Sequence, residues 1–216
     1  MGTRRIKYYS KSEGQKQTQP VKNKKSLENL MYHFIAKIEK ARNNQQKRLA
    51  DRNWMLVLIG INTAFRAEDL LQLRVKDVMN GYVCIKENKT GKVQNFKMRK
   101  EFYQDISSYI ERHELTSTDY LFKSRRSDGE VRCITRQQAD RILAQAKKDL
   151  RFKFNFSLHS LRKTFGYHYY LDGGKLLTLQ KMYNHESPDV TLDYIMWNTT
   201  DAEDSRAAIY LGAVHK

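Results

Sequence analysis

The stretch Trp54–Ile59 limits the possible folds of this chain more than any other segment, because it reads Trp-Met-Leu-Val-Leu-Ile without a polar residue. It lies in a longer helical segment, from about Leu49 to Asn62, that is apolar on most of its faces. Such a helix is typical of the centre of a domain. An amphipathic helix precedes it, with apolar residues at helical spacing at Leu27, Leu30, Met31, Phe34, Ile35 and Ile38.

The pattern changes character between residues 75 and 98, where short apolar runs indicate strands. Asn88-Lys89-Thr90-Gly91 supplies the residues of a hairpin turn between two of them. On both sides the helical pattern dominates, with expected helices at 68–73, 99–114, 135–150 and 157–171 and two or three short helices at the end. The predicted fold is mainly α with one small three-stranded antiparallel β-sheet, an α+β class.

The chain carries 40 Lys and Arg against 24 Asp and Glu, a formal net charge of +16 over 216 residues. Solubility alone needs a net charge of roughly 2–8 for a small domain. Basic surface favours nucleic acid, because phosphate contacts release counterions. A nucleic-acid partner is therefore the leading hypothesis, and a merely basic soluble protein is the alternative.

The excess of positive charge begins at the N-terminus, where residues 1–25 contain eight basic side chains and one acid, Glu13. This composition predicts a flexible basic arm that either lies along phosphates or is a solvated tail. Residues 26–216 are expected to form one domain.

Cys84 and Cys133 are isolated thiols without the spacing of a zinc site, which fits a reducing cytoplasm. The N-terminus lacks the apolar core of a signal peptide, and no apolar run approaches the roughly 20 residues of a membrane span. We expect a cytoplasmic protein without metal, cofactor or membrane partner.

Two arginines have the chemistry to hold a phosphodiester, since each guanidinium offers a planar fork of donors that stays charged. Arg66 stands in an apolar stretch, and Asp69, three residues later, could orient it from the same helical face. Arg162 follows His159 by three residues, which places both on one face of a helix. Taken alone, Arg66 with Asp69 is better explained as an ordinary ion pair within a helix, and the spacing of His159 and Arg162 arises by chance in many proteins.

His185 follows Asn184, a residue that tolerates the left-handed conformation, and a turn with Pro188 leads into a helix that carries Tyr194. A tyrosine hydroxyl can attack phosphorus, and imidazole can move a proton near neutral pH. The chain has 13 Tyr, so a structural role is the default for any one of them.

The joint pattern resembles the tyrosine recombinases, the phage integrase family. Residues 63–73, Thr-Ala-Phe-Arg-Ala-Glu-Asp-Leu-Leu-Gln-Leu, resemble its first arginine box, and residues 89–92, Lys-Thr-Gly-Lys, resemble its catalytic lysine turn. Residues 159–165 resemble the second box, and residues 184–195 resemble the third box with the nucleophile. The resemblance covers residues 26–216, with every box in order. Ala64, Asp69 and Asn184 are mild departures, because the family more often has Gly, Glu and Gly there.

The resemblance implies a division of labour among six residues. Arg66 and Arg162 would clamp the scissile phosphate, and His185 would hydrogen-bond it. Lys89 would protonate the leaving 5′ oxygen, His159 would transfer the tyrosine proton, and Tyr194 would form a 3′-phosphotyrosyl link without metal or ATP. Lys86 and Lys92 flank Lys89 and are the alternatives for its role, since a shift of one residue reverses the face of a strand.

The implied function is that of a site-specific DNA recombinase or integrase of bacterial, phage or mobile-element origin, acting at the nucleoid. Its partners would be double-stranded DNA and further copies of itself, as a tetramer at synapsis and a monomer in free solution. A relaxing enzyme of the type IB topoisomerase kind and a non-catalytic DNA-binding regulator are the alternatives. Only residues 1–25 precede the matching region, so a compact member and a fragment both fit.

The last segment, residues 201–216, combines acidic and small apolar residues. In the resembling family such a tail docks on a neighbouring subunit, and packing on its own domain is the alternative.

Overall fold

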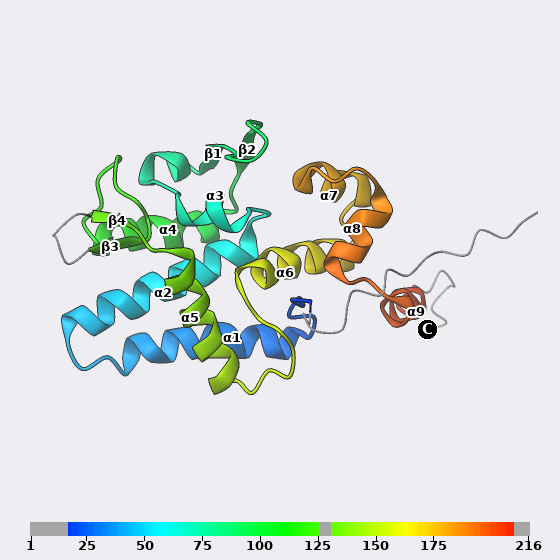
Figure 1. Ribbon diagram of the computed structural model, residues 1–216, viewed down its shortest axis with the longest axis horizontal. Helices are drawn as coiled ribbons and strands as arrows, with labels where there is room; N and C mark the ends of the chain where they lie inside the picture. Colours follow the sequence, from blue (N-terminus) through cyan, green and yellow to red (C-terminus); the bar gives the residue numbers. More distant parts are fainter. Residues whose placement is uncertain (1–16, 126–130, 210–216) are drawn as a thin grey trace, which may run out of the picture.

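The computed structural model describes residues 17–125 and 131–209 and is mainly helical (Figure 1). The first two helices, α1 (Lys24–Glu39) and α2 (Asn44–Asn62), lie side by side as a hairpin along the long axis of the molecule. Asn23 and Asn43 cap them by accepting the backbone N–H of Ser26 and Gln46. The Asn43 cap explains why α2 starts earlier than its apolar pattern predicts.

The prediction that the apolar stretch of α2 forms the centre of the domain is confirmed. Met55, Leu56 and Val57 are fully buried and belong to the main hydrophobic core. The helix α6 (Leu158–Leu171) crosses α2 at Gly60, where an added Cβ would lie 2.6 Å from Leu161 Cδ1. The absence of a side chain at Gly60 therefore lets α2 and α6 approach closely.

The mainly α fold with small antiparallel sheets is confirmed, but the single three-stranded sheet is wrong. The strands β1 (Tyr82–Lys86) and β2 (Val93–Lys97) form one two-stranded sheet, and β3 (Lys123–Arg125) and β4 (Val131–Cys133) form another. The segment Val75–Val78 is a 3₁₀ helix, η1, rather than a strand, because both of its valines turn into the core.

The remaining helices are α3 (Ala67–Leu71), α4 (Lys100–Arg112), α5 (Arg136–Asp149), α7 (Leu176–Tyr183), α8 (Pro188–Ile195) and α9 (Thr199–Ala207). In the view of Figure 1, α4 and α5 lie near the α1–α2 hairpin, and α7, α8 and α9 lie together at the right. The expected helix at 135–150 is confirmed as α5, and a capping box of Thr135 and Gln138 starts it. Gly173, with φ at +88°, follows the end of α6.

A second hydrophobic cluster joins α6, α7 and α8 and contains Ala64, Tyr167, Leu179, Tyr183 and Ile195. Its closest packing is at Gly166, where an added Cβ would lie 2.2 Å from the hydroxyl oxygen of Tyr183. This cluster fixes the short helices that carry His185 and Tyr194 against the helix that carries Arg162.

The two ends of the described chain meet beside α6. Residues 17–23, which the sequence groups with the basic arm, lie against this helix, and the rest of the predicted arm, residues 1–16, is outside the described residues. Every residue of α9 is at least partly exposed, while Asp201 contacts its own domain through Tyr167. Residues 210–216 of the predicted tail are likewise not described, so the arm and the docking tail stay predictions.

Candidate active site

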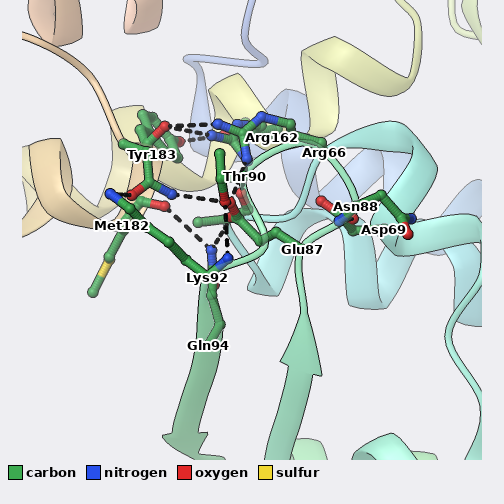
Figure 2. A network of polar contacts seen from close by, with 12 residues as sticks. Arg66, Asp69, Glu87, Asn88, Thr90, Lys92, Gln94, Arg162, Met182 and Tyr183 are labelled. Carbon is green, nitrogen blue, oxygen red and sulfur yellow. Dashed lines mark hydrogen bonds and ion pairs between the residues drawn. The ribbon is translucent and has the colours of Figure 1, made fainter.

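Arg66 and Arg162 converge on one backbone atom. The Nη2 atoms of both residues donate to the carbonyl oxygen of Tyr183, each at 3.2 Å, and Figure 2 shows both guanidiniums directed at this oxygen. Arg66 lies at the N-terminus of α3, and Arg162 lies in the first half of α6. The fold thus brings together two cations that are far apart in the sequence.

Arg162 is 3% exposed, and its surroundings suit a permanent charge. It also donates to the carbonyl of Ala64, and its Cζ lies 4.4 Å from the centre of the Tyr183 ring. Burial lowers the pKa of Arg162, but a guanidinium stays protonated at any physiological pH. Carbonyl oxygens and a ring face therefore hold a fixed positive charge.

The carboxylate paired with Arg66 is Glu87, which sequence reasoning missed. Its Oε2 lies 2.7 Å from Arg66 Nη1, and the residue is 1% exposed. Glu87 also accepts hydrogen bonds from Thr90, Gln94 and Asn184 (Figure 2). Although burial works to raise it, the pKa of Glu87 is held below its ordinary value by the bonds from Thr90 and Arg66. The sequence did contain a signal for this pairing, because Glu87 is the one acidic residue among the hairpin lysines.

Asp69 does not make the expected ion pair with Arg66. Its Oδ1 accepts the backbone N–H of Asn88 at 2.9 Å, at the start of the turn between β1 and β2. Burial raises the pKa of Asp69, and the nearby charge of Glu87 adds to this. Asp69 therefore supports the hairpin turn. Its interaction with Arg66 is a longer-range electrostatic attraction.

Two lysines of the hairpin turn, Lys89 and Lys92, lie in different surroundings. Lys92 Nζ donates to Asn184 Oδ1 at 2.8 Å, next to His185. Lys89 is exposed in the turn, where Gly91 adopts a φ of +67°. The structure brings Lys92 to the site, and the catalytic role of Lys89 stays a prediction.

The rings of His185, in the turn between α7 and α8, and Tyr194, in α8, meet in an edge-on arrangement. Asn184 is left-handed, with φ at 54°, as its sequence position predicts. Pro188 is the first residue of α8, as predicted, and Ser187 caps this helix. The ring centres of His185 and Tyr194 are 5.1 Å apart, and the Tyr194 ring lies 6.0 Å from Arg162 Cζ.

The electrostatics of this pair follow from burial beside arginines. Burial, with the charges of Arg162 and Arg66, lowers the pKa of His185 to about 4. The imidazole is therefore neutral at neutral pH, and its Nδ1 lies 3.1 Å from Thr191 Oγ1. Burial raises the pKa of Tyr194, while the charge of Arg162 opposes this shift. The Tyr194 hydroxyl consequently needs a proton acceptor before it can act as a nucleophile.

His159 shares α6 with Arg162 but contacts a different residue. Its Nε2 lies 3.1 Å from Nη2 of Arg136, at the first turn of α5. Burial lowers the pKa of His159, and the charge of Arg136 adds to the shift. His159 is therefore kept neutral, the form that can accept a proton, and Arg136 is a second neighbour that sequence reasoning missed.

Two competing tyrosines already donate their hydroxyl groups within the fold. Tyr183 donates to the carbonyl of Arg162 at 2.6 Å, and Tyr167 donates to Asp201 at 2.8 Å. Both are buried. The packing therefore favours Tyr194 over these two as the tyrosine that reacts.

Over residues 17–125 and 131–209, no three His, Cys, Asp or Glu side chains come together as metal ligands. In the same part of the chain, no helix is long and apolar enough to cross a membrane.

A helical domain with two converging arginines, two histidines and a partly buried tyrosine is typical of the catalytic-domain class of the tyrosine recombinases. The chain belongs to the phage integrase family, whose model matches residues 26–200. It is 37% identical over 158 residues to the "Probable integrase/recombinase YoeC" of Bacillus subtilis (strain 168), covering 73% of this chain and 82% of that protein.

Two solved structures share the fold at low sequence identity. The XerA recombinase has a TM-score of 0.66 at 17% identity, with 93% of this chain and 68% of XerA covered. The XerH site-specific recombinase, in a post-cleavage complex with palindromic difH substrate, has a TM-score of 0.66 at 22% identity. That match covers 91% of this chain but 54% of XerH, so the chain spans about half of that relative's length.

Proposed function

We propose that this protein is a site-specific DNA recombinase that cleaves and rejoins DNA through a 3′-phosphotyrosine at Tyr194. The observation that carries the proposal is the convergence of Arg66 and Arg162 on the Tyr183 carbonyl oxygen, beside the adjacent rings of His185 and Tyr194. Two fixed guanidiniums suit a phosphodiester, whose nonbridging oxygens gain charge as a nucleophile attacks.

In the proposed reaction, side chains of this protein supply the nucleophile and transfer both protons. The Tyr194 hydroxyl oxygen bonds to phosphorus as its proton passes to His159, and the bond from phosphorus to the 5′ oxygen breaks. Lys89 gives the leaving 5′ oxygen its proton, and His185 donates a hydrogen bond to the phosphate. Since the ester bond is replaced by another ester, the 5′ hydroxyl of a second strand can reverse the step without metal or ATP.

The roles assigned to Lys89 and His159 depend on where bound DNA places the scissile phosphate. Lys89 is exposed in the hairpin turn, and His159 contacts Arg136. The phosphate of bound DNA attracts a lysine in a turn more readily than one in a packed strand. Lys92 is the alternative acid, because it already lies against Asn184.

Double-stranded DNA is the proposed partner, with a tetramer at synapsis and a monomer in free solution. The net charge of +16 supports the first part, and the Tn1549 transposon integrase, which shares the fold, is described as in complex with a circular intermediate DNA. Affinity for a duplex should fall steeply with added salt, as counterion release requires. A binding constant that stays flat with salt would argue against this partner.

The decisive experiment for the function offers the protein a library of nicked duplexes with randomised sequence, in which cleavage traps the covalent intermediate. We expect adducts that survive denaturation, with enriched target sequences, from the native protein and none from Tyr194→Phe. Relaxation of supercoiled plasmid without sequence enrichment would instead indicate the topoisomerase alternative. DNA binding without any adduct would indicate the regulatory alternative.

A further inference from the structure

Residues 17–23, which we call the strap, are docked along α6. The backbone N–H of Val21 donates to Thr164 Oγ1 at 2.9 Å, and the carbonyl of Val21 lies 2.9 Å from His168 Nε2. Val21 itself is 1% exposed and belongs to the main core. The strap is therefore part of the packed domain at the helix that carries Arg162.

The strap also reaches the last described helix. Lys22 Nζ lies 2.6 Å from Asp201 Oδ2, and the Tyr167 hydroxyl donates to the other oxygen of the same carboxylate. The Lys22 ammonium lies 5.0 Å from the centre of the Tyr167 ring. These contacts fix the strap between α6 and α9.

Lys163 connects the strap with Tyr194. Its Nζ donates to the carbonyl oxygen of Thr18 at 2.8 Å and lies 5.1 Å from the centre of the Tyr194 ring. The residue is 3% exposed, an unusual position for a lysine. A buried ammonium needs acceptors, and here a strap carbonyl and an aromatic face supply them.

We propose that Lys163 is a positioning residue for Tyr194 and that the strap, through the Thr18 carbonyl, sets where Lys163 holds the tyrosine ring. This inference rests on the proposed role of Tyr194 as the nucleophile. Arg162 and Lys163 are consecutive, and Tyr194 lies near both cations. Arg162 forms the clamp together with Arg66, whereas Lys163 donates to a carbonyl of the strap.

The geometry gives this arrangement a consequence for rate. Attack on phosphorus needs the tyrosine oxygen close to the phosphorus and in line with the leaving group. A displaced reacting group can lose roughly a hundredfold in rate. Arg66 and Arg162 make the clamp, and Lys163 donates to the strap carbonyl of Thr18. We therefore expect the loss of Lys163 to slow cleavage while DNA still binds.

The first test compares Lys163→Met, which keeps the length of the side chain, with Lys163→Arg, which keeps its charge. We expect Lys163→Met to bind nicked duplex nearly as well as the native protein and to form the adduct roughly tenfold to a hundredfold more slowly. Lys163→Arg should recover most of the rate. Lys24→Met, which removes an exposed lysine near the strap, is the matched control and should cleave normally.

An adduct rate in Lys163→Met equal to that of the native protein would overturn the proposal. So would an equal loss of binding and cleavage in Lys163→Met with no recovery in Lys163→Arg, because that pattern indicates a purely structural lysine.

A second measurement needs no DNA and covers the case in which Lys163→Met folds poorly. Thr164→Val removes the acceptor of the Val21 N–H with little change in shape and leaves Lys163 in place. We expect hydrogen–deuterium exchange to rise in the strap and also in α8, which carries Tyr194. Faster exchange in the strap with an unchanged α8 would show that the two are independent, and the proposal would be wrong.

The two measurements also separate this inference from the proposed function. If the native protein forms no adduct with any duplex, the recombinase proposal fails. The exchange experiment still decides whether the strap and the tyrosine helix are coupled.

Discussion

Arg66 and Arg162 donate to the same carbonyl oxygen, that of Tyr183, from two different helices. That oxygen lies near the end of α7, immediately before the left-handed Asn184 and His185. One backbone atom thus links the first, second and third sequence boxes of the family. The arrangement fixes the spacing of the two cations before any DNA arrives, so their charge needs little reorganisation during the reaction.

The planar fork of Arg162 is expected to matter beyond its charge. Arg162→Lys keeps a cation but loses the donors that reach Ala64 and Tyr183. We expect the adduct rate to fall about a hundredfold to a thousandfold, as for other lost transition-state donors. Arg99→Lys makes the same chemical change at an exposed position and should have normal activity. Full activity in Arg162→Lys would contradict the clamp.

Glu87 should prove more important for stability than Asp69. Glu87→Gln leaves Arg66 without its carboxylate and should lower the free energy of unfolding by about 1–3 kcal/mol, measured by urea denaturation. Asp69→Asn keeps an acceptor for the Asn88 N–H and should cost less. Equal losses in the two variants would show that the ion pair of Arg66 with Glu87 contributes no more to stability than the contacts of Asp69.

The pKa of His185 predicts a dependence of stability on pH. Its folded pKa is about 4, below the ordinary value of 6.5, so the unfolded chain takes up the proton first as pH falls. The stability that the neutral His185 side chain contributes to the folded state is fully present above pH 6.5 and is lost as pH falls towards 4. Because solvent screens a half-exposed ring, the change should be on the order of 1 kcal/mol.

The matched variant for this pH effect is His185→Gln, whose side chain does not titrate. The unfolding free energy of the native protein minus that of this variant should fall as the pH is lowered from 6.5 to 4. A difference that stays constant over that range would mean that the His185 pKa is not depressed.

The C-terminal segment should contribute to assembly rather than to folding. Truncation after Ala207 keeps the Asp201 contacts with Lys22 and Tyr167 and removes the exposed Ile209. We expect the same thermal midpoint and weaker multimer formation on DNA, measured by sedimentation. Unchanged assembly would leave packing on its own domain as the better account of the tail.

The sequence predicted the central helix, Pro188 at the start of α8 and the left-handed Asn184 because each depends on local chemistry. It missed the pairing of Arg66 with Glu87, since a contact between a helix N-terminus and a hairpin has no fixed sequence spacing. It also took Val75 and Val78 for a strand, because two buried valines look alike in a strand and in a tight turn. The docking of the strap on α6 was hidden by the basic composition of the residues around it.

The chemistry assigned to Tyr194 is tested most directly by mapping the peptide that carries the DNA. The adduct trapped on an enriched nicked duplex would be digested with protease and nuclease and analysed by mass spectrometry. We predict a single nucleotide-linked tyrosine, Tyr194, joined to a 3′ phosphate. Linkage at Tyr183 or any other residue, or at a 5′ phosphate, would contradict the central claim.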